Sequence, residues 1–180
     1  PNDRQVGQAR PNDRQYSVGR GTADFLEKIV IDAGVGRLSA QPGFEDKILP
    51  QIEKDLAIIA GQKPQIRRAR KSIAGFKIRA GQVVGLRVTL RRKRMVDFFN
   101  RLIKIVLPRV RDFGGVSAKS VDGGGVLNIG LREQFAFPEI NPEQSPLSFS
   151  LGIALVPRGR TREEAIEKMR AAGAPLKEER

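Results

Sequence analysis

The chain has no cysteine, no histidine and no tryptophan among its 180 residues. Without cysteine it has neither a disulfide framework nor a thiolate nucleophile, and it lacks Cys-ligated zinc and iron–sulfur sites. Without histidine it lacks the base of a Ser-His-Asp triad and the commonest metal ligand. Catalysis by carboxylates or by a perturbed lysine stays formally open, but such an enzyme would be unusual.

Long hydrophobic runs are also missing. The longest candidate, Leu147–Val156, is strand-sized and is interrupted by serine and glycine, whereas a membrane-spanning helix needs about 20 apolar residues. Hydrophobic residues still make up 39% of the chain, so a core can form and wholesale disorder is not expected. We expect a soluble protein with no membrane partner.

Acidic residues are absent from one long segment. The formal net charge is +13, and the 41 residues from Leu56 to Val96 contain no Asp or Glu. The rest of the chain is almost neutral, with 21 basic and 20 acidic residues. The 12 basic residues of the segment are Lys63, Arg67, Arg68, Arg70, Lys71, Lys77, Arg79, Arg87, Arg91, Arg92, Lys93 and Arg94.

A basic segment of this kind is typical of a surface that binds a polyanion, because each cation that neutralises a phosphate releases condensed counterions. One alternative is a solvated basic face, but such faces usually mix both signs of charge. Another is a patch for anionic lipid, which would normally lie on an amphipathic helix. Because these residues lie on strand-like chain rich in glycine, the pattern favours nucleic acid.

The hydrophobic pattern predicts an alternation of strands and helices. Pro50 marks a kink or a late start of the first helix, and the second helix closes before Pro108. The last helix opens with a capping box, Thr161-Arg-Glu-Glu164. The predicted elements are a strand over 28–32, a helix over 44–59, strands over 64–70 and 83–91, a helix over 95–105, strands over 126–131 and 148–156, and a helix over 161–173.

This order points to an α+β fold. Its first six elements follow the split βαβ arrangement of ferredoxin-like and RRM-like folds, an antiparallel sheet with helices on one face. Long basic loop insertions are added, above all the basic loop Lys71–Gly81 between two strands. The other face of the sheet is left free, and Arg67, Arg87 and Arg91 come from strands that could be neighbours. We expect this open face to be basic.

The predicted domain organisation is one α+β domain over 25–176. A polar tail over 1–24 precedes it, and a short tail over 177–180 follows it. In the first tail, the sequence Pro-Asn-Asp-Arg-Gln of residues 1–5 recurs at 11–15. One duplication of five residues does not make a solenoid, so we interpret this segment as a flexible tail that can fold on a partner.

Nucleotide-binding motifs are incomplete. Gly34-Val-Gly36 follows a strand, but Ser39 stands where a dinucleotide fingerprint needs its third glycine. Gly123-Gly-Gly125 is not followed by the Lys-Ser/Thr of a P-loop and is interpreted as a flexible or close-approach loop. Aromatic residues make up only 6% of the chain, which disfavours an RRM that stacks bases and favours recognition of phosphate, 2′-OH and shape.

The basic loop places Phe76 and Ile78 among glycines and cations, where the core cannot easily bury them. One interpretation is that Phe76 docks against nucleic acid while Lys77 and Arg79 hold phosphates. The other is a hairpin whose Phe76 folds back onto the sheet. The loop sequence alone leaves both open.

Six segments together resemble the ribosomal protein L5 family. They occur in the family's order and spacing over roughly Lys28 to Gly173, and six in register are far more specific than any one alone. The segments are Gly61-Gln-Lys-Pro64, Lys71-Ser-Ile-Ala-Gly-Phe-Lys-Ile-Arg79, Val88-Thr-Leu-Arg91, Leu107-Pro-Arg-Val-Arg-Asp-Phe113, Lys119-Ser120 and Phe137-Pro-Glu-Ile140. The resemblance implies a structural RNA-binding protein of the large ribosomal subunit with no catalytic activity and no cofactor.

The resemblance also implies partners. In the family the sheet face binds 5S rRNA in the central protuberance, beside large-subunit rRNA and neighbouring proteins, and a long loop, here Ala74–Gly81, reaches the P-site tRNA. The loops near Arg109–Ser117 and Arg132–Ile140 are expected to face the small-subunit head across an intersubunit bridge. The predicted RNA-binding residues are Asp32, Gln62, Lys63, Arg67, Arg68, Arg70, Lys71, Thr89, Arg91 and Arg92. The predicted tRNA-contacting residues are Gly75, Phe76, Lys77 and Arg79.

The chain departs from the family pattern in three places. Asp32 stands where the family usually has Asn, and a carboxylate repels phosphate and cannot donate a hydrogen bond. An RNA contact there requires that Asp32 accept from a ribose hydroxyl or pair with an arginine. Arg92 and Lys93 stand where the family tends to have glycine and an acidic or polar residue. The usual amphipathic N-terminal helix is replaced by the duplicated tail, which favours a mitochondrial over a bacterial ribosome.

The leading hypothesis is therefore a 5S-rRNA-binding protein of the large ribosomal subunit that acts in translation. A general RNA-binding module or RNA chaperone acting off the ribosome is the alternative, and it would bind many structured RNAs about equally. An enzyme such as a phosphotransferase would need clustered acids or a phosphate loop, and the acidic residues here are scattered outside the basic segment.

Overall fold

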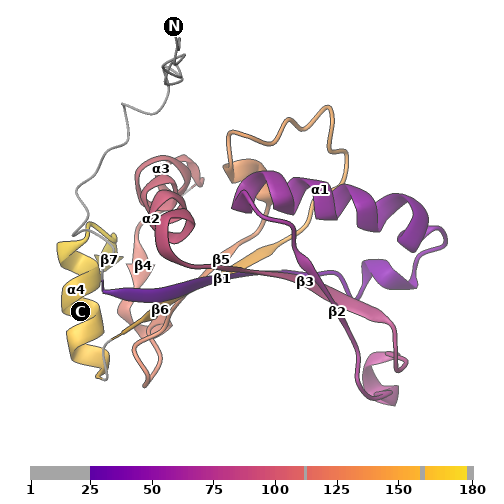
Figure 1. Cartoon of the computed structure of the whole chain (residues 1–180), viewed down its shortest axis with the longest axis horizontal. Coiled ribbons are helices and arrows are strands. Elements are labelled where there is room, and N and C mark those ends of the chain that lie inside the picture. Colours follow the sequence, from indigo (N-terminus) through magenta and orange to yellow (C-terminus); the bar gives the residue numbers. More distant parts are fainter. Residues whose placement is uncertain (1–24, 112, 159–160, 178–180) are drawn as a thin grey trace, which may run out of the picture.

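A computed structural model describes residues 25–111, 113–158 and 161–177, so the predicted tails over 1–24 and 178–180 lie outside the described residues. Five antiparallel strands form one sheet in the order β2-β3-β1-β6-β5 (Figure 1). Two further strands, β4 and β7, form a small parallel pair. The strands are β1 Leu26–Gly34, β2 Gln65–Arg68, β3 Val83–Leu90, β4 Val116–Ser117, β5 Leu127–Leu131, β6 Leu151–Pro157 and β7 Leu176–Lys177.

Helices α1 and α2 lie on the same side of the five-stranded sheet, and α4 lies beside β4 and β7 at one end (Figure 1). A π-helical turn, Phe44–Ile48, leads into α1, and another, Leu102–Val106, joins α2 to α3. Short 3-10 turns lie at 38–40, 74–76, 118–120 and 134–136. The helices are α1 Leu49–Ala60, α2 Arg92–Arg101, α3 Leu107–Arg109 and α4 Arg162–Ala171.

The core lies between the sheet and the helices. Alternate residues of the central strands are buried because successive side chains of a strand point to opposite faces. Ile29, Ile31 and Ala33 of β1 are at most 1% exposed and belong to the same buried cluster as Ile52 and Leu56 of α1. The remaining large core side chains include Leu86, Val88, Leu90, Phe98, Phe99, Leu102 and Phe137. The α+β fold with helices on one face is confirmed.

The other alternate residues form the open face, on the side of the sheet away from α1 and α2. One row crosses all five strands in register, from Gln65 through Arg87, Asp32 and Gly152 to Gly130. A second row contains Thr89, Val30, Ala154 and Asn128. The open face predicted from the element order is therefore present.

One detail of the predicted topology is wrong. The first six elements would place the strand predicted over 126–131 beside the first strand, but β1 instead pairs with β6, and β5 lies outside it at the sheet edge. Leu151, Ile153 and Leu155 of β6 are all buried and fit a central position. The connection from β5 to β6 buries Phe137 and Phe149, so it packs as part of the core.

The proline and glycine signals mostly mark the ends of the helices. Pro50 lies in the first turn of α1, directly after the π-helical turn Phe44–Ile48, so the helical path begins near Phe44 and the regular α-helix only at Leu49. Thr161 accepts a hydrogen bond from the Glu164 amide at 3.3 Å, and Gly173 follows α4 with φ of +88°. The predicted stop before Pro108 is wrong, because the helical path continues through Arg109. Proline has no backbone N–H and would leave a gap in the i→i−4 hydrogen bonds of a regular α-helix. The π turn before Pro108 already interrupts that bonding pattern, so the proline is tolerated there.

Candidate nucleic-acid interface

An ion pair lies at the centre of the open face. The Nε of Arg87 donates to Oδ1 of Asp32 at 2.6 Å, and Nη2 of Arg87 lies 3.3 Å from Oδ2. Both side chains remain about 40% exposed, and the hydrogen bond to Asp32 raises the pKa of Arg87 above its ordinary value. Asp32 therefore pairs with an arginine, one of the two conditions under which it could lie against RNA.

A second group of charges lies at the end of the face where β3 enters α2. Nη1 of Arg91 donates to Oε1 of Glu27 at 3.3 Å, and Nζ of Lys28 lies 3.6 Å from the same oxygen. The hydrogen bond from Arg91, together with the charge of Lys28, lowers the pKa of Glu27 below its ordinary value. Two of the cations here thus share one carboxylate.

Small residues form the floor of the open face around the ion pair. A Cβ added to Gly130 would meet nothing within 4 Å, and one added to Gly152 would lie 3.9 Å from the Asp32 carbonyl oxygen. Neither position needs glycine for its own packing, and glycine inside a strand often marks a close approach by a ligand or another backbone. Gly85 differs, because an added Cβ would lie 2.9 Å from the Ala33 carbonyl oxygen.

Of the other predicted residues, Thr89 is in β3, whereas Gln62 and Lys63 lie between α1 and β2. Thr89 lies on the face opposite Val30. Gln62 follows α1 and accepts from Nη1 of Arg94 at 3.1 Å, whereas Lys63 pairs with Glu53 of α1 at 3.2 Å.

Arg92 has φ of +53°, a left-handed conformation that favours glycine. This is the position at which the family resemblance leads one to expect glycine.

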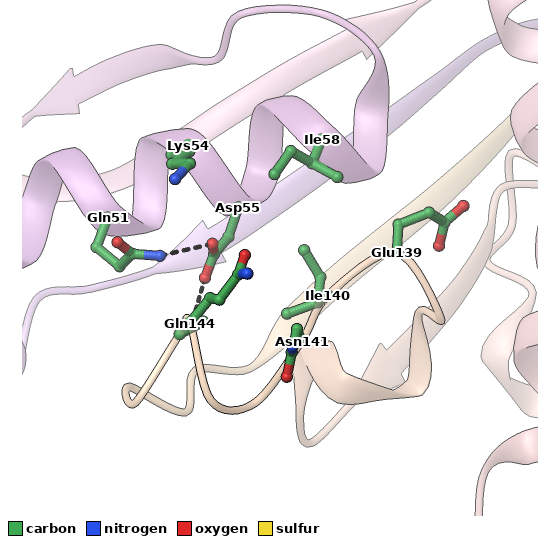
Figure 2. Close-up of a pocket in the computed structure, with 9 residues that line it drawn as sticks. Gln51, Lys54, Asp55, Ile58, Glu139, Ile140, Asn141 and Gln144 are labelled. Carbon is green, nitrogen blue, oxygen red and sulfur yellow. Dashed lines mark hydrogen bonds between the residues drawn. The ribbon is translucent and has the colours of Figure 1, made fainter.

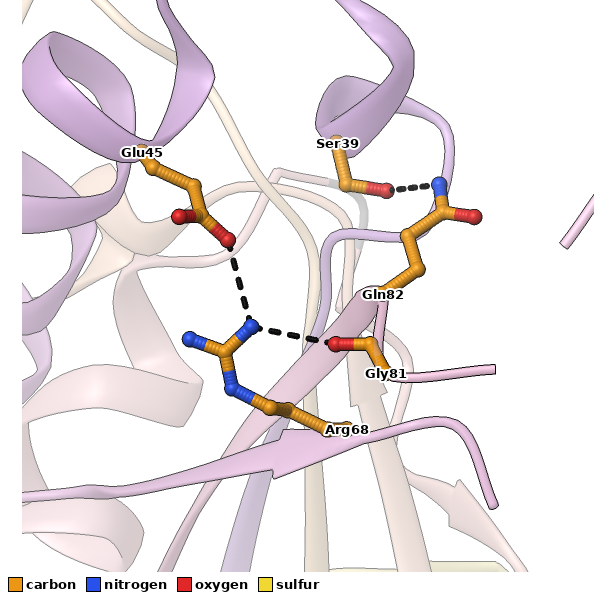
Figure 3. Close-up of polar contacts among 5 residues, drawn as sticks. All are labelled: Ser39, Glu45, Arg68, Gly81 and Gln82. Carbon is orange, nitrogen blue, oxygen red and sulfur yellow. Dashed lines mark hydrogen bonds and ion pairs between the residues drawn. The ribbon is translucent and has the colours of Figure 1, made fainter. Parts of the chain in front are cut away.

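Arg67 and Arg68 are adjacent in β2 but lie on opposite sides of the sheet. Nη1 of Arg67 lies 3.4 Å from Oε1 of Gln65, on the open face. Arg68 follows a register shift, and its Nη1 donates to Oε1 of Glu45 at 3.2 Å and to the Gly81 carbonyl oxygen at 3.0 Å (Figure 3). The sequence analysis predicted the same RNA-binding role for both arginines, whereas the structure places their side chains on opposite sides of the sheet.

The basic loop is internally hydrogen-bonded. Ile73 and Ile78 exchange backbone hydrogen bonds of 2.9 and 3.2 Å, and the hydroxyl of Ser72 accepts from the Ala80 amide at 2.9 Å. Gly75 and Phe76 lie in the 3-10 turn at its tip, and Lys77 follows with φ of +53°. Phe76 is 77% exposed, so it does not fold back onto the sheet.

Cations in and beside the basic loop differ from those of the sheet. Among the described residues, no acidic side chain forms an ion pair with Arg70, Lys71, Lys77 or Arg79. With Phe76 and the half-exposed Ile73 they make a projection that is both cationic and apolar. Such a surface suits phosphate together with an exposed base.

A shallow depression lies on the helix side of the molecule, and polar side chains that line it form hydrogen bonds with one another. It lies between α1 and the segment 139–145, and Nε2 of Gln51 donates to Oδ1 of Asp55 there at 2.9 Å (Figure 2). The hydroxyl of Ser145 donates to Oδ2 of the same carboxylate, which is 3% exposed. These bonds hold the connection from β5 to β6 on α1 and leave Asp55 no evident chemical role.

The part of the chain that the structure describes contains no group of three acidic side chains placed to hold a metal ion. Nor do these residues include a helix long and apolar enough to cross a membrane.

Comparison with known proteins decides the family. Residues 25–79 match the family model described as ribosomal protein L5, and residues 83–176 match the model of the C-terminus of the same ribosomal family. The chain belongs to the ribosomal protein L5 family. It is a ribosomal protein and not an enzyme, as the sequence predicted. The two matched regions are interleaved, because β3 of the second pairs between β1 and β2 of the first.

Bacterial members of the L5 family are similar over most of their length. The large ribosomal subunit protein uL5 of Rubrobacter xylanophilus is 53% identical over 152 residues, covering 84% of this chain and 82% of that protein. Those of Chlorobaculum tepidum and Fusobacterium nucleatum are each 45% identical, covering 84% of this chain and 81% of each relative. These relatives give no support to the preference for a mitochondrial ribosome.

Proposed function

We propose that this L5-family protein is a structural constituent of the large ribosomal subunit that binds 5S rRNA through the open face. The observation that carries the proposal is a sheet face that α1 and α2 leave uncovered and that combines Arg67, Arg87 and Arg91 with a floor of small residues. Because double-stranded RNA is recognised mainly by shape and by its 2′-OH and phosphate groups, such a face suits an A-form backbone.

The predicted contact residues divide into three groups by position. The carboxylate of Asp32 is neutralised by Arg87 and keeps free lone pairs, so it can accept from a ribose 2′-OH without strong repulsion of phosphate. Asp32, Arg67 and Thr89 are proposed to meet RNA on the open face, Gln62, Lys63, Arg91 and Arg92 at its α2 end, and Arg70 and Lys71 at the base of the basic loop. Arg68 is left out of these groups, because it bonds Glu45 on the other side of the sheet.

The basic loop is proposed to contact the P-site tRNA. Exposed Phe76 can stack on a base or ribose, while Lys77 and Arg79 bind phosphates and Gly75 lets the turn approach closely. The loops near Arg109–Ser117 and Arg132–Ile140 are proposed to bridge to the small-subunit head. Large-subunit rRNA and neighbouring proteins of the central protuberance complete the proposed partners.

Sedimentation of a lysate at moderate and high salt tests the assembly. We expect the protein and 5S rRNA to travel together in the large-subunit fraction and to leave it together as a small particle. A protein that stays at the top of the gradient in both salts would contradict the proposal. Because the named relatives are bacterial, we assign the ribosome to the bacterial type, without a mitochondrial preference.

A salt titration with isolated 5S rRNA tests the open face. Arg67→Gln should lower the slope of log affinity against log salt by about 0.7–0.9, the value for one lost phosphate contact. Lys54→Gln removes the same charge from α1, on the helix side, and should leave the slope unchanged. Equal effects of the two variants, or equal affinity for unrelated structured RNAs, would favour a general RNA-binding module.

Crosslinking in reconstituted ribosomes tests the basic loop separately. Phe76→Ala together with Lys77→Gln and Arg79→Gln should remove contact with P-site tRNA but leave the affinity for isolated 5S rRNA unchanged. A loss of 5S rRNA binding instead would contradict the division of roles between loop and sheet.

A further inference from the structure

The direction in which the basic loop projects is not set by packing. Every described residue from Ala69 to Gln82 is exposed or only half-buried, so the loop has no hydrophobic core of its own. Backbone bonds at its base, from the Ala69 amide to Gln82 at 2.8 Å and from the Gly81 amide to Ala69 at 2.9 Å, only continue the hairpin of β2 and β3. Contacts with the rest of the protein must therefore orient it.

Two polar contacts connect this base to the segment between β1 and α1. Arg68 bridges the Gly81 carbonyl oxygen, at 3.0 Å, and the carboxylate of Glu45, at 3.2 Å. Nε2 of Gln82 donates to the hydroxyl of Ser39 at 2.7 Å, and Figure 3 shows both contacts in one view. The two contacts lie on the two sides of the Gly81–Gln82 peptide bond, so together they restrict both translation and rotation of the loop.

Gln82 and Ser39, the two residues of the second contact, make further hydrogen bonds, Gln82 to the loop and Ser39 to the body of the protein. Oε1 of Gln82 accepts from the Arg79 amide at 3.0 Å, which connects the contact to a cation of the loop. The Ser39 hydroxyl donates to the Gly36 carbonyl oxygen at 2.8 Å, which fixes the hydroxyl to the chain two residues beyond the end of β1. Hydrogen bonds thus connect the Gly36 carbonyl oxygen through Ser39 and Gln82 to the Arg79 amide.

We propose that Arg68 and Gln82 are positioning residues that hold the basic loop against the segment 36–45, and that Arg68 does not bind phosphate on the open face. The inference rests on the proposed function, in which the loop contacts RNA. Arg68 and Glu45 are 52% and 62% exposed, and exposed pairs contribute little to global stability. Losing the contact should change the population of the described loop orientation about twofold to fivefold without unfolding the protein.

The absence of cysteine allows a direct measurement of loop orientation in the full chain. Spin labels at Ala74→Cys in the loop and Lys54→Cys on α1 report the distance between loop and body. Arg68→Gln should broaden this distance distribution, and Arg68→Gln with Gln82→Ala should broaden it further. Arg67→Gln is the matched control with the same charge change on the other face, and it should leave the distribution as in the unmodified protein. Equal distributions in all variants would overturn the proposal.

Binding to 5S rRNA provides the second readout. Arg67→Gln should lower the salt slope, whereas Arg68→Gln should leave both affinity and slope within about twofold of the unmodified protein. If Arg68→Gln lowers the slope as much as Arg67→Gln does, Arg68 is a phosphate ligand and the proposal fails.

Cleavage of RNA by an iron chelate attached at Ala74→Cys in reconstituted ribosomes then distinguishes positioning from the proposed function. A sharp cleavage pattern that becomes diffuse in Arg68→Gln supports both. A distance distribution that broadens without any RNA cleavage supports the positioning role and contradicts the proposed RNA contact of the loop. A pattern that stays sharp in Arg68→Gln overturns the positioning role.

Discussion

On the open face, Arg87 and Arg91 are paired with Asp32 and Glu27, whereas in the basic loop Lys77 and Arg79 have no partner among the described acidic residues. The open face lies on a rigid five-stranded sheet, and the loop projects beyond it without a core. A count of charges therefore overstates the electrostatic attraction of the sheet. Shape and hydrogen-bonding groups should dominate recognition by the open face, and free cations should dominate recognition by the loop.

The largest expected effect comes from filling the floor of the open face. Gly152→Leu places a large side chain beside Asp32, where only RNA is proposed to lie, and should weaken 5S rRNA binding about 100-fold, or about 2.7 kcal/mol. The nearest atom to an added Cβ is 3.9 Å away, so the fold should be retained. Filter binding measures affinity, and circular dichroism checks folding.

The control for this change is Gly123→Leu, because a Cβ there meets nothing within 4 Å and lies away from the open face, in the turn before β5. It should bind as the unmodified protein does. Full affinity of a folded Gly152→Leu variant would show that RNA does not approach the centre of the sheet.

Breaking the central ion pair should make the open face more like the loop. Asp32→Asn removes the charge that neutralises Arg87, so the affinity for 5S rRNA should rise about fivefold and the salt slope should steepen by about 0.7–0.9. Asp97→Asn on α2 is the same change on the helix side and should have no effect. The side-chain oxygen of asparagine can still accept from a ribose 2′-OH, so a loss of affinity would contradict the release of Arg87 toward phosphate.

Arg92 is expected to trade stability for RNA contact at the edge of the open face. Its φ of +53° is strained for arginine, so Arg92→Gly should raise the free energy of unfolding by about 0.5–1 kcal/mol. The same variant should bind 5S rRNA less tightly. Denaturant unfolding measures the first effect. Lys93→Gly is the control: its φ is not positive, and glycine inside a helix costs about 1 kcal/mol. Destabilisation by both variants would exclude strain at Arg92.

The smallest effect concerns Glu27, whose pKa is lowered by Arg91 and Lys28. A carboxyl with a lowered pKa contributes its stability above its ordinary pKa, about 4.3, and loses it as the pH falls through the folded value. Glu27→Gln should therefore flatten the dependence of the unfolding temperature on pH below about 4.5. Glu133→Gln, a carboxyl in no described ion pair, should leave that dependence unchanged. The same pH profile in Glu27→Gln and the unmodified protein would show that the pair is not formed in solution.

Local patterns identified most of the elements. The alternation of Ile29, Ile31 and Ala33 and the helical spacing of Ile52 and Leu56 each reflect burial on one face, which a single segment already encodes. The strand β4 in the connection 109–125 was not predicted, because two residues carry no periodicity. Its partner β7 lies about 60 residues further along the chain, so no local signal could reveal the pair.

The candidate site was predicted less completely than the fold. The basic segment and the family resemblance identified the residues, but not which of them share a face. Arg87 was predicted only as part of a basic face, because its bond to Asp32 joins residues 55 positions apart. The small floor formed by Gly130 and Gly152 was missed, since each glycine alone looks like an ordinary break in a strand.

The sequence by itself determined the excess of positive charge, the absence of thiol and imidazole chemistry, the order of strands and helices and the family. These properties depend on composition and on short-range patterns, which survive in any arrangement of the chain. Only the tertiary structure decided that β6 lies beside β1 and that Arg67 and Arg68 face opposite sides of the sheet. It also decided that Asp32 and Glu27 neutralise cations of the sheet, whereas Lys77 and Arg79 of the basic loop have no partner among the described acidic residues. Those outcomes depend on strand register and on contacts between distant segments, which no local pattern contains.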